Sequence, residues 1–194
     1  MVKKRYGLGI LAITLVFGMT LIGCSNPTGG ETWSDIKSID QMHGTWVGSY
    51  KQTMTIEDFY KEFTNDDWDS DLQNEFGNMK VTINVLMTMN IDKNENEMSG
   101  TVEMKMTFSG GNIKTVWEEL SDGISSEYNN EESEVKIILD SGNYSITIIA
   151  VTPKGKIENP EALLKGLKIN ETETKILVPA DLDEGTPEMI MFKQ

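Results

Sequence analysis

Residues 81–91, with the sequence VTINVLMTMNI, decide how the chain is expected to fold. Apolar side chains occupy every second position of this stretch, which is the period of a β-strand. The polar sequence DKNENE follows at 92–97, and GTVEMKMTF at 100–108 then alternates in the same way. Two alternating runs separated by a short polar turn predict an antiparallel β-hairpin.

The register of this hairpin follows from a pairing of Asp92 with Glu97. Apolar residues then face apolar residues at each step along one side of the ladder, which stabilises the pairing. The facing pairs are Val85 with Met104, Ile83 with Met106, and Val81 with Phe108.

Weaker alternating runs predict further strands along the chain. A second hairpin is expected around the turn residues Ser141, Gly142 and Asn143. Many antiparallel strands with hairpin signals predict a mainly β domain, an antiparallel up-and-down barrel of about eight strands, with a clam-like sheet as the alternative. The remaining strands are expected at 44–56, 134–140, 144–151, 172–178 and 188–194.

Two segments after the first predicted strand have apolar residues at helical spacing. We expect them to form a helical insertion with a break near Thr64 and Asn65, whose side chains suit an N-cap. The residues at helical spacing are Ile56, Phe59, Tyr60 and Phe63 in the first segment, and Trp68, Leu72 and Phe76 in the second.

Two further segments favour helices later in the chain. Residues 159–166 have Asn159 in a capping position, Pro160 in the first turn and Gly166 as the stop, which predicts a short helix. Residues 113–120 fit a helix ending near Gly123, but their apolar spacing also suits a strand.

The first 23 residues have the composition of a signal peptide. Three basic residues stand near the start, and residues 7–23 carry no charge before a polar stretch begins. The sequence at 21–24, Leu-Ile-Gly-Cys, resembles the lipobox of bacterial lipoproteins. That resemblance implies cleavage before Cys24 and a diacylglycerol attached to its thiol, which would anchor the chain to a membrane.

The lipoprotein resemblance also sets the expected domain organisation and location. Residues 1–23 are the expected signal peptide, 24–39 a flexible tether and 40–194 the barrel domain. Ser25 stands where an aspartate would often signal inner-membrane retention in enteric bacteria. We therefore expect an extracytoplasmic protein of the cell envelope, at the outer membrane or cell surface.

The start of the first strand, Gly44-Thr45-Trp46, resembles the signature of lipocalins and related calycins. Residues 57–78 fill the place of the long, lid-bearing connection in that family. The resemblance implies a barrel that holds a small apolar ligand. No arginine occurs after Arg5, so the arginine that stacks on the family's tryptophan is missing here.

Small barrels of this kind can enclose one ligand. The expected ligand is apolar or amphipathic, because the inward positions are rich in methionine, an adaptable residue common on promiscuous binding surfaces. The alternative is that the same side chains fill a solid core, in which case the chain would be a protein–protein interaction lipoprotein of the envelope. The candidate cavity and lid residues are Trp46, Tyr50, Met54, Phe59, Phe63, Trp68, Ile83, Val85, Met87, Met104 and Met106.

A run of acids gives a second, weaker candidate site. Asp67, Asp69 and Asp71 have the spacing of the first ligands of a calcium loop, but Leu72 and Asn78 stand where that loop needs glycine and glutamate. Acids that favour the start of a helix are the better explanation, so no metal is expected.

Catalysis and nucleic-acid binding have little support in the composition. His43 is the only histidine and Cys24 the only cysteine, so triad, zinc and paired-thiol schemes lack parts. The net charge of −14 disfavours nucleic acid. We therefore expect a lipid-anchored binding protein without enzymatic activity or cofactor.

Overall fold

A computed structural model describes residues 31–64, 68–93, 97–128, 135–179 and 188–194. The predicted signal peptide and Cys24 lie outside these residues. Within the described ranges, no helix is both long and apolar enough to span a membrane.

The described elements are β1 (Trp33–Asp35), a 3-10 helix η1 (Ile39–Met42), β2 (Gly44–Thr55), α2 (Ile56–Thr64), α3 (Ser70–Phe76), β3 (Lys80–Ile91), β4 (Glu97–Ser109), α4 (Ile113–Tyr128), β5 (Val135–Asp140), β6 (Ser145–Lys156), α5 (Pro160–Leu164), β7 (Lys168–Asn170), β8 (Lys175–Val178) and β9 (Met189–Lys193).

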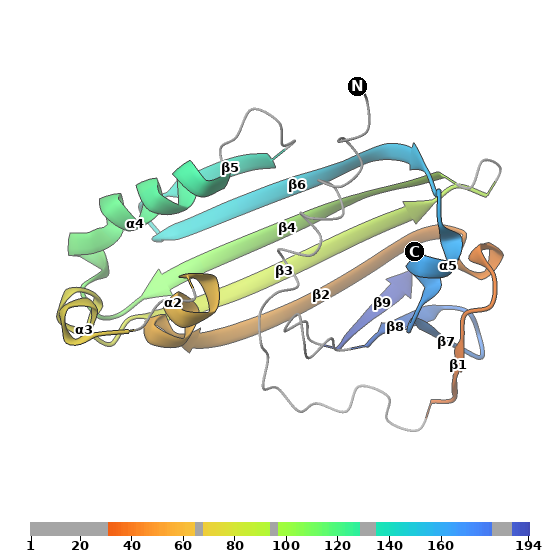
Figure 1. The fold of residues 1–194 in the computed structure, drawn as a ribbon, viewed down its shortest axis with the longest axis horizontal. Coiled ribbons are helices and arrows are strands. Elements are labelled where there is room, and N and C mark those ends of the chain that lie inside the picture. Colours follow the sequence, from red (N-terminus) through yellow and green to blue (C-terminus); the bar gives the residue numbers. More distant parts are fainter. Residues whose placement is uncertain (1–30, 65–67, 94–96, 129–134, 180–187) are drawn as a thin grey trace. The chain divides into compact units, whose positions relative to one another are not determined.

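The strands of the described residues form one antiparallel sheet of nine strands (Figure 1). Their order is β1-β7-β8-β9-β2-β3-β4-β6-β5. The mainly β, antiparallel prediction is confirmed, but the predicted closed barrel of about eight strands is not what these strands form. Closure requires the two edge strands to pair, and the pairing of the three-residue β1 is with β7, so the sheet is open.

The two predicted hairpins are both present. The amide N–H of Asp92 donates to the carbonyl of Glu97 over 2.8 Å, which closes the β3–β4 hairpin at the predicted pair. In the second hairpin Asp140 pairs with Ser145 and Val135 with Ala150. β6 continues to Lys156, five residues beyond the predicted end at 151.

The strand predicted at 172–178 is shorter in the structure. β8 begins at Lys175, because the preceding residues form a turn held by the side chain of Asn170. The amides of Thr174 and Lys175 each donate to Asn170 Oδ1 over 3.0 Å. Asn170 itself ends β7, a strand that the sequence pattern did not predict.

The predicted tether includes residues that pair with the sheet. Trp33–Asp35 form β1, and Trp33 pairs with Asn170 of β7. Ile36 is buried directly after this strand. Within 31–36, the apolar Trp33 is half-buried and Ile36 is buried, whereas the other four side chains are exposed.

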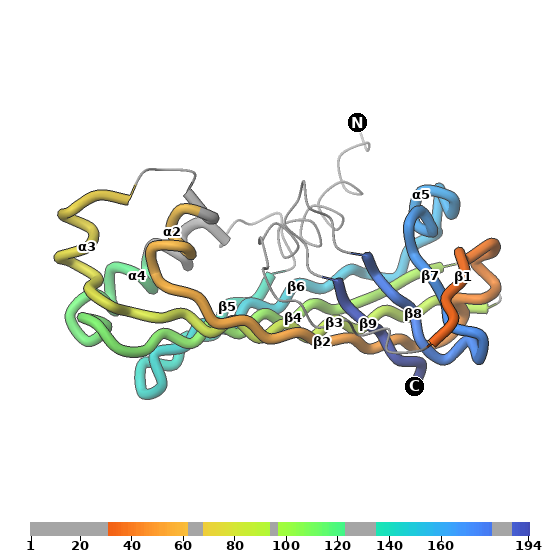
Figure 2. Tube along the Cα trace, turned by 90° about the horizontal axis from the view of Figure 1, so that it is seen from below, coloured from red at the N-terminus to blue at the C-terminus, as the bar shows by residue number. Residues whose placement is uncertain are grey.

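The chain divides into two compact units. We call residues 51–85 and 103–150 the helical unit, because α2, α3 and α4 belong to it, and the other described residues the terminal unit. In the helical unit, the three helices lie on one side of the strands (Figure 2). The long strands β2, β3, β4 and β6 each contribute residues to both units.

Two of the predicted helical segments are present, and the predicted start of a third helix is wrong. The short helix at 159 is confirmed, since Asn159 Oδ1 accepts from the amide of Ala162 and Pro160 is its first residue. Residues 113–120 are helical, within α4. The predicted cap at Thr64 and Asn65 is wrong for α3, whose N-cap is Asp69, so Trp68 precedes this helix.

Candidate functional site

The candidate cavity residues are distributed over both units. Trp46, Tyr50 and Met87 belong to the terminal unit, and the other candidates belong to the helical unit. The side chain of Phe63 lies outside what the structure describes. Tyr50 and Trp68 are half-buried, and the remaining candidates are buried: Trp46, Met54, Phe59, Ile83, Val85, Met87, Met104 and Met106.

The start of α2 is fixed to the sheet by its own sequence. Thr55 caps the start of α2: the amide of Asp58 donates to Thr55 Oγ1, and this hydroxyl donates to the Asp58 carboxylate. The amide of Ile56 donates to the carbonyl of Met79 over 3.0 Å. These bonds set the direction in which α2 leaves β2 and place Phe59 within the unit.

Asn112 joins α3 to α4. Its side-chain amide donates to the carbonyls of Asn74 and Glu75 over 3.0 and 2.8 Å, and its own amide donates to the carbonyl of Phe76. Carbonyls at a helix C-terminus lack intrahelical partners, so Asn112 satisfies the end of α3 at the position where α4 begins.

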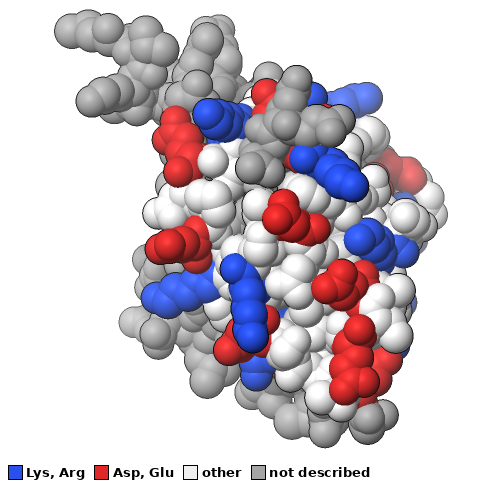
Figure 3. Space-filling model, turned by 90° about the vertical axis from the view of Figure 1, so that its right-hand side faces the viewer, with Lys and Arg blue, Asp and Glu red and all other residues white. Residues whose placement is uncertain are grey.

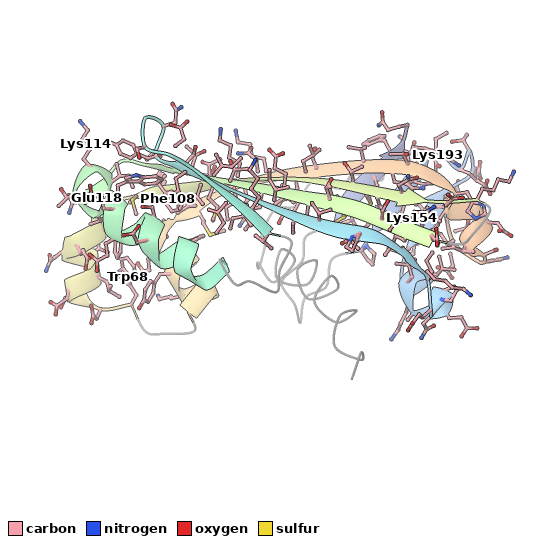
Figure 4. All side chains as sticks on the ribbon, turned by 90° about the horizontal axis from the view of Figure 1, so that it is seen from above. Trp68, Phe108, Lys114, Glu118, Lys154 and Lys193 are labelled. Carbon is pink, nitrogen blue, oxygen red and sulfur yellow. The ribbon has the colours of Figure 1, made fainter. Side chains whose placement is uncertain are left out.

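Four aromatic rings connect the helices of this unit to its strands. Phe59 of α2 meets Phe108 of β4 at a centroid distance of 6.0 Å, and Phe108 meets Trp117 of α4 at 6.3 Å. Trp117 meets Tyr144 of the β5–β6 turn at 5.5 Å. In Figure 4, Phe108 extends from β4 on the side where α4 lies. The helices are therefore fixed by edge contacts between rings from separate elements.

A second aromatic group lies beside α2 and α3. The ring of Trp68 is 5.6 Å from that of Tyr60 and 6.0 Å from that of Phe76. Trp68 Nε1 donates to Gln73 Oε1 over 3.2 Å, which ties the residue to α3 although it precedes this helix. Trp68 thus packs against residues of α2 and α3, and Figure 4 shows it beside these helices.

The apolar strand face of the helical unit contains one polar exception. Gln52 shares a face of β2 with Met54 by strand alternation, and its Oε1 atom is buried without a hydrogen-bond partner among the described residues. The neighbouring Thr53 lies on the other face, where its hydroxyl is 2.9 Å from that of Thr82. A buried acceptor without a partner costs about 1–3 kcal/mol, so this position favours a ligand that carries a donor.

Trp46 belongs to the buried core of the terminal unit. It is fully buried, and its Nε1 donates to the carbonyl of Met42 over 2.6 Å. Lys193 of β9 lies with its Nζ 5.2 Å from the centroid of the Trp46 ring. A lysine on the last strand therefore supplies the cation next to the tryptophan, in a chain that has no arginine after Arg5.

Close approach of β9 explains the glycine two residues after Trp46. Gly48 pairs with Met191. A Cβ added at Gly48 would lie 2.9 Å from both Met189 Sδ and Met191 Cγ. The side chains of β9 thus occupy the space that a larger residue at position 48 would need.

Charged groups in the described part of the chain form small clusters of opposite charge. Lys154 Nζ lies 3.3 Å from Asp92 Oδ2 and 2.8 Å from Glu97 Oε2, so that one cation offsets part of the charge of two acids at the end of the β3–β4 hairpin. The face of the molecule drawn in Figure 3 shows acidic and basic side chains interspersed with uncharged surface. Interspersed charges favour solubility over binding of a polyanion.

The pKa of Asp140 in the β5–β6 turn is lowered from its ordinary value. The side-chain hydrogen bond from Asn143 is the largest cause of a lowered pKa, followed by the backbone amide of Asn143, with a smaller effect from the amide of Gly142. These bonds close the turn between β5 and β6, next to Ser141 and Tyr144.

The acidic run that suggested calcium acts in a helix cap. Asp69 Oδ1 accepts from the amides of Asp71 and Leu72, both over 2.9 Å. Asp67 lies outside the described residues. The described residues contain no group of three or more His, Cys, Asp or Glu side chains able to hold a metal ion. His43 Nε2 lies 3.7 Å from Asp40 Oδ1.

Three contributors were missed by the reasoning from sequence. Gln52 and Lys193 stand in alternating strands, where only the pairing of distant strands reveals their neighbours. Asn112 follows Gly110 and Gly111, two residues with positive φ of 75° and 50°. That pair of glycines was the available signal for a tight connection at this point.

Comparisons with protein-family models, with curated proteins and with solved structures found no match to this chain.

Proposed function

We propose that this chain is a lipid-anchored, extracytoplasmic binding protein that holds a small apolar or amphipathic ligand. The ligand would lie against the apolar strand face of the helical unit, with α2 as the covering element. The single observation that carries the proposal is the unpartnered Oε1 of Gln52, buried on a face that also presents Met54. A closed barrel is not required for this mode of binding.

The chemistry of the face fits such a ligand. Methionine side chains adapt to different apolar shapes because they are unbranched and polarisable. Ligand sites are usually apolar with a few polar groups that fix orientation. The strand residues of the helical unit supply the first property through Met54, Ile83, Val85, Met104 and Met106, all buried, and Gln52 supplies the second.

Saturable binding of a lipophilic probe tests the proposal. N-phenyl-1-naphthylamine has an apolar body and one N–H donor, and its fluorescence rises on leaving water. We expect one saturable site on the purified chain, and Met104→Trp should weaken binding about tenfold or more by filling the space. Lys105→Trp, at the adjacent exposed position of β4, is the matched control and should bind as the wild type does.

The role of Gln52 can be tested by changing either partner. A long-chain alcohol should displace the probe better than its methyl ether, which has no donor. Gln52→Leu should lower the ratio of the affinities for the alcohol and the ether by about five- to tenfold, which corresponds to the free energy of one hydrogen bond. Absence of saturable binding in the wild type would overturn the proposal, whereas binding with an unchanged preference would overturn only the role of Gln52.

The second candidate function is a non-catalytic interaction lipoprotein with a solid core. The nearly complete burial of Ile83, Met104 and Met106, at 0%, 2% and 1% exposure, is what favours it. Native mass spectrometry of the protein purified from its own cells separates the two functions. A retained small molecule supports the binding protein, and a bare chain supports the interaction protein.

The lipid anchor has an independent test. Labelling cells with a radioactive or clickable palmitate should mark the wild-type protein and leave Cys24→Ser unmarked. An unlabelled wild type would contradict lipidation at Cys24 without affecting the proposed ligand site.

A further inference from the structure

The two edges of the sheet differ in how well they could accept another strand. β1 has three residues, Trp33–Asp35, and two of them are polar. β5 has six residues, Val135–Asp140, with the sequence VKIILD, and β6 is its one neighbour among the described strands. A long apolar edge strand is a template for pairing, and short or charged edges prevent it.

The side chains of β5 are unusually exposed for apolar residues. Ile138 and Leu139 are 42% and 45% exposed, on opposite sides of the strand. The strand contains no proline, and its pairing with β6 is continuous from Val135 to Asp140, without a bulge. Its backbone is therefore regular enough to accept a partner along the edge.

One antiparallel register makes β5 complementary to itself. With Ile138 opposite Ile138 of a second copy, Ile137 lies opposite Leu139, and Lys136 lies opposite Asp140. Both charged residues then face an opposite charge, and Ile137, Ile138 and Leu139 each meet an apolar residue, while Val135 lies opposite Ser141 beyond the end of the strand. Centring the pair on Ile137 instead would place Lys136 opposite Ile138 and leave its charge without a partner in the added strand.

We propose that β5 pairs antiparallel with β5 of a second copy of this chain, with Ile138 at the two-fold axis and Lys136 facing the partner's Asp140. The hydrogen bonds that Asp140 accepts from Gly142 and Asn143 fix its carboxylate and leave it able to accept from an ammonium group, because a carboxylate has about four acceptor positions. In a closed two-fold contact of this kind β5 of each copy is paired with the other, so no third copy can add to the sheet at this edge.

The area of such a contact is small. Five residues of each strand, 136–140, pair with one another in this register, so the buried area falls below the roughly 1,000 Å² of a stable interface. The dimer should therefore be weak and should increase with protein concentration. This inference concerns self-association and does not depend on the proposed ligand.

Disulfide trapping tests the register directly. In the full chain with Cys24→Ser, Ile138→Cys provides one thiol at the proposed axis. Mild oxidation should produce covalent dimer at least about fivefold faster than for Lys105→Cys, an exposed cysteine on β4, because facing Cβ atoms in antiparallel strands lie about 4.5–5.5 Å apart. Equal rates for the two variants would overturn the proposal.

A mixing experiment excludes pairing in other registers. Ile137→Cys and Leu139→Cys should each crosslink poorly alone, because the identical positions are offset along the strands. A mixture of the two should give a heterodimer, since these positions face each other in the proposed register. A homodimer from Leu139→Cys as abundant as this heterodimer would contradict the register.

Charge reversal tests the contact without a crosslink. Sedimentation velocity of the full chain, in one non-ionic detergent for all variants, should show a concentration-dependent dimer. Lys136→Asp places two acids opposite each other and should weaken dimerisation about fivefold or more, whereas Lys136→Arg should retain it. Circular dichroism checks that each variant is folded, and a dimer unaffected by Lys136→Asp would overturn the proposal.

Discussion

Trp117 of the helical unit and Trp46 of the terminal unit are both buried, with exposures of 7% and 0%, but their surroundings differ. Trp117 lies between the rings of Phe108 and Tyr144, and its Nε1 donates to Ser141 Oγ over 3.0 Å. These partners come from β4 and from the turn between β5 and β6. The tertiary contacts of Trp117 therefore depend on both β4 and this turn being in place.

Trp46 depends more on its own neighbourhood. Its hydrogen bond goes to Met42, four residues earlier, and the cation over its ring comes from Lys193 on β9. A local bond forms with little loss of chain entropy, while contacts between distant elements require loop closure first. The helical unit is therefore held by contacts between aromatic rings, and the terminal unit by a local hydrogen bond and strand pairing.

The largest effect should come from breaking the ring contacts. Phe108 is 2% exposed and touches the rings of both Phe59 and Trp117. Phe108→Ala should lower the free energy of unfolding by about 3–5 kcal/mol, because it removes a buried ring and leaves a cavity. Urea unfolding measures the loss, and hydrogen exchange should show faster opening of α4 than of β8.

The control for this prediction is the same substitution at an exposed ring. Phe192→Ala, at 48% exposure on β9, should change the free energy of unfolding by no more than about 0.5 kcal/mol. Equal losses for the two variants would show that the contacts of Phe108 do not hold the helical unit together.

The next effect concerns the local bond of the terminal unit. Trp46→Phe keeps an aromatic ring but removes the donor to the Met42 carbonyl. It should destabilise the protein by about 1–3 kcal/mol, the cost of a buried acceptor left without its bond. Trp33→Phe is the matched control, because Trp33 Nε1 has no hydrogen-bond partner among the described residues. A control as damaging as Trp46→Phe would contradict this role of the bond.

The same difference between local and distant contacts explains how much of the fold the sequence predicted. The β3–β4 hairpin was predicted with its closing pair because strand alternation and the turn both lie in one short stretch. β1 and β7 have three residues each, too few to show a period. Whether the sheet closes depends on pairing between its edges, which alternation within a strand does not determine.

The candidate site was predicted to a similar depth. Alternation marked Met54, Ile83 and Met104 as facing inward, and they are buried. It could not show that Trp46 belongs to a different compact unit from these residues. Alternation also gave no reason to select Gln52, because the role of a polar residue at an inward position depends on which groups surround it.

A smaller effect should follow from removing the cation over Trp46. Lys193→Met keeps an unbranched side chain over the ring and removes the charge, and should cost about 0.5–1 kcal/mol. Lys193→Arg should retain most of the stability, because arginine also stacks on aromatic faces. Urea unfolding of the three proteins in the same buffer measures both changes, and equal losses for Met and Arg would assign the effect to packing.

The smallest effect concerns the turn that carries two partners of Trp117. The lowered pKa of Asp140 means that its charged form is favoured in the folded state, with the bond from Asn143 as the main cause. Stability from this group is fully present above the unfolded value, near 3.8, and is lost as the pH falls through the lower folded value. Asp140→Asn should therefore melt below the wild type at pH 6, and the difference should shrink as the pH falls below that unfolded value. Asn143→Ala removes the main cause and should show the same loss of pH dependence. If the difference in melting temperature between wild type and Asp140→Asn stays constant down to the lowest pH measured, the charge of the carboxylate does not stabilise the turn.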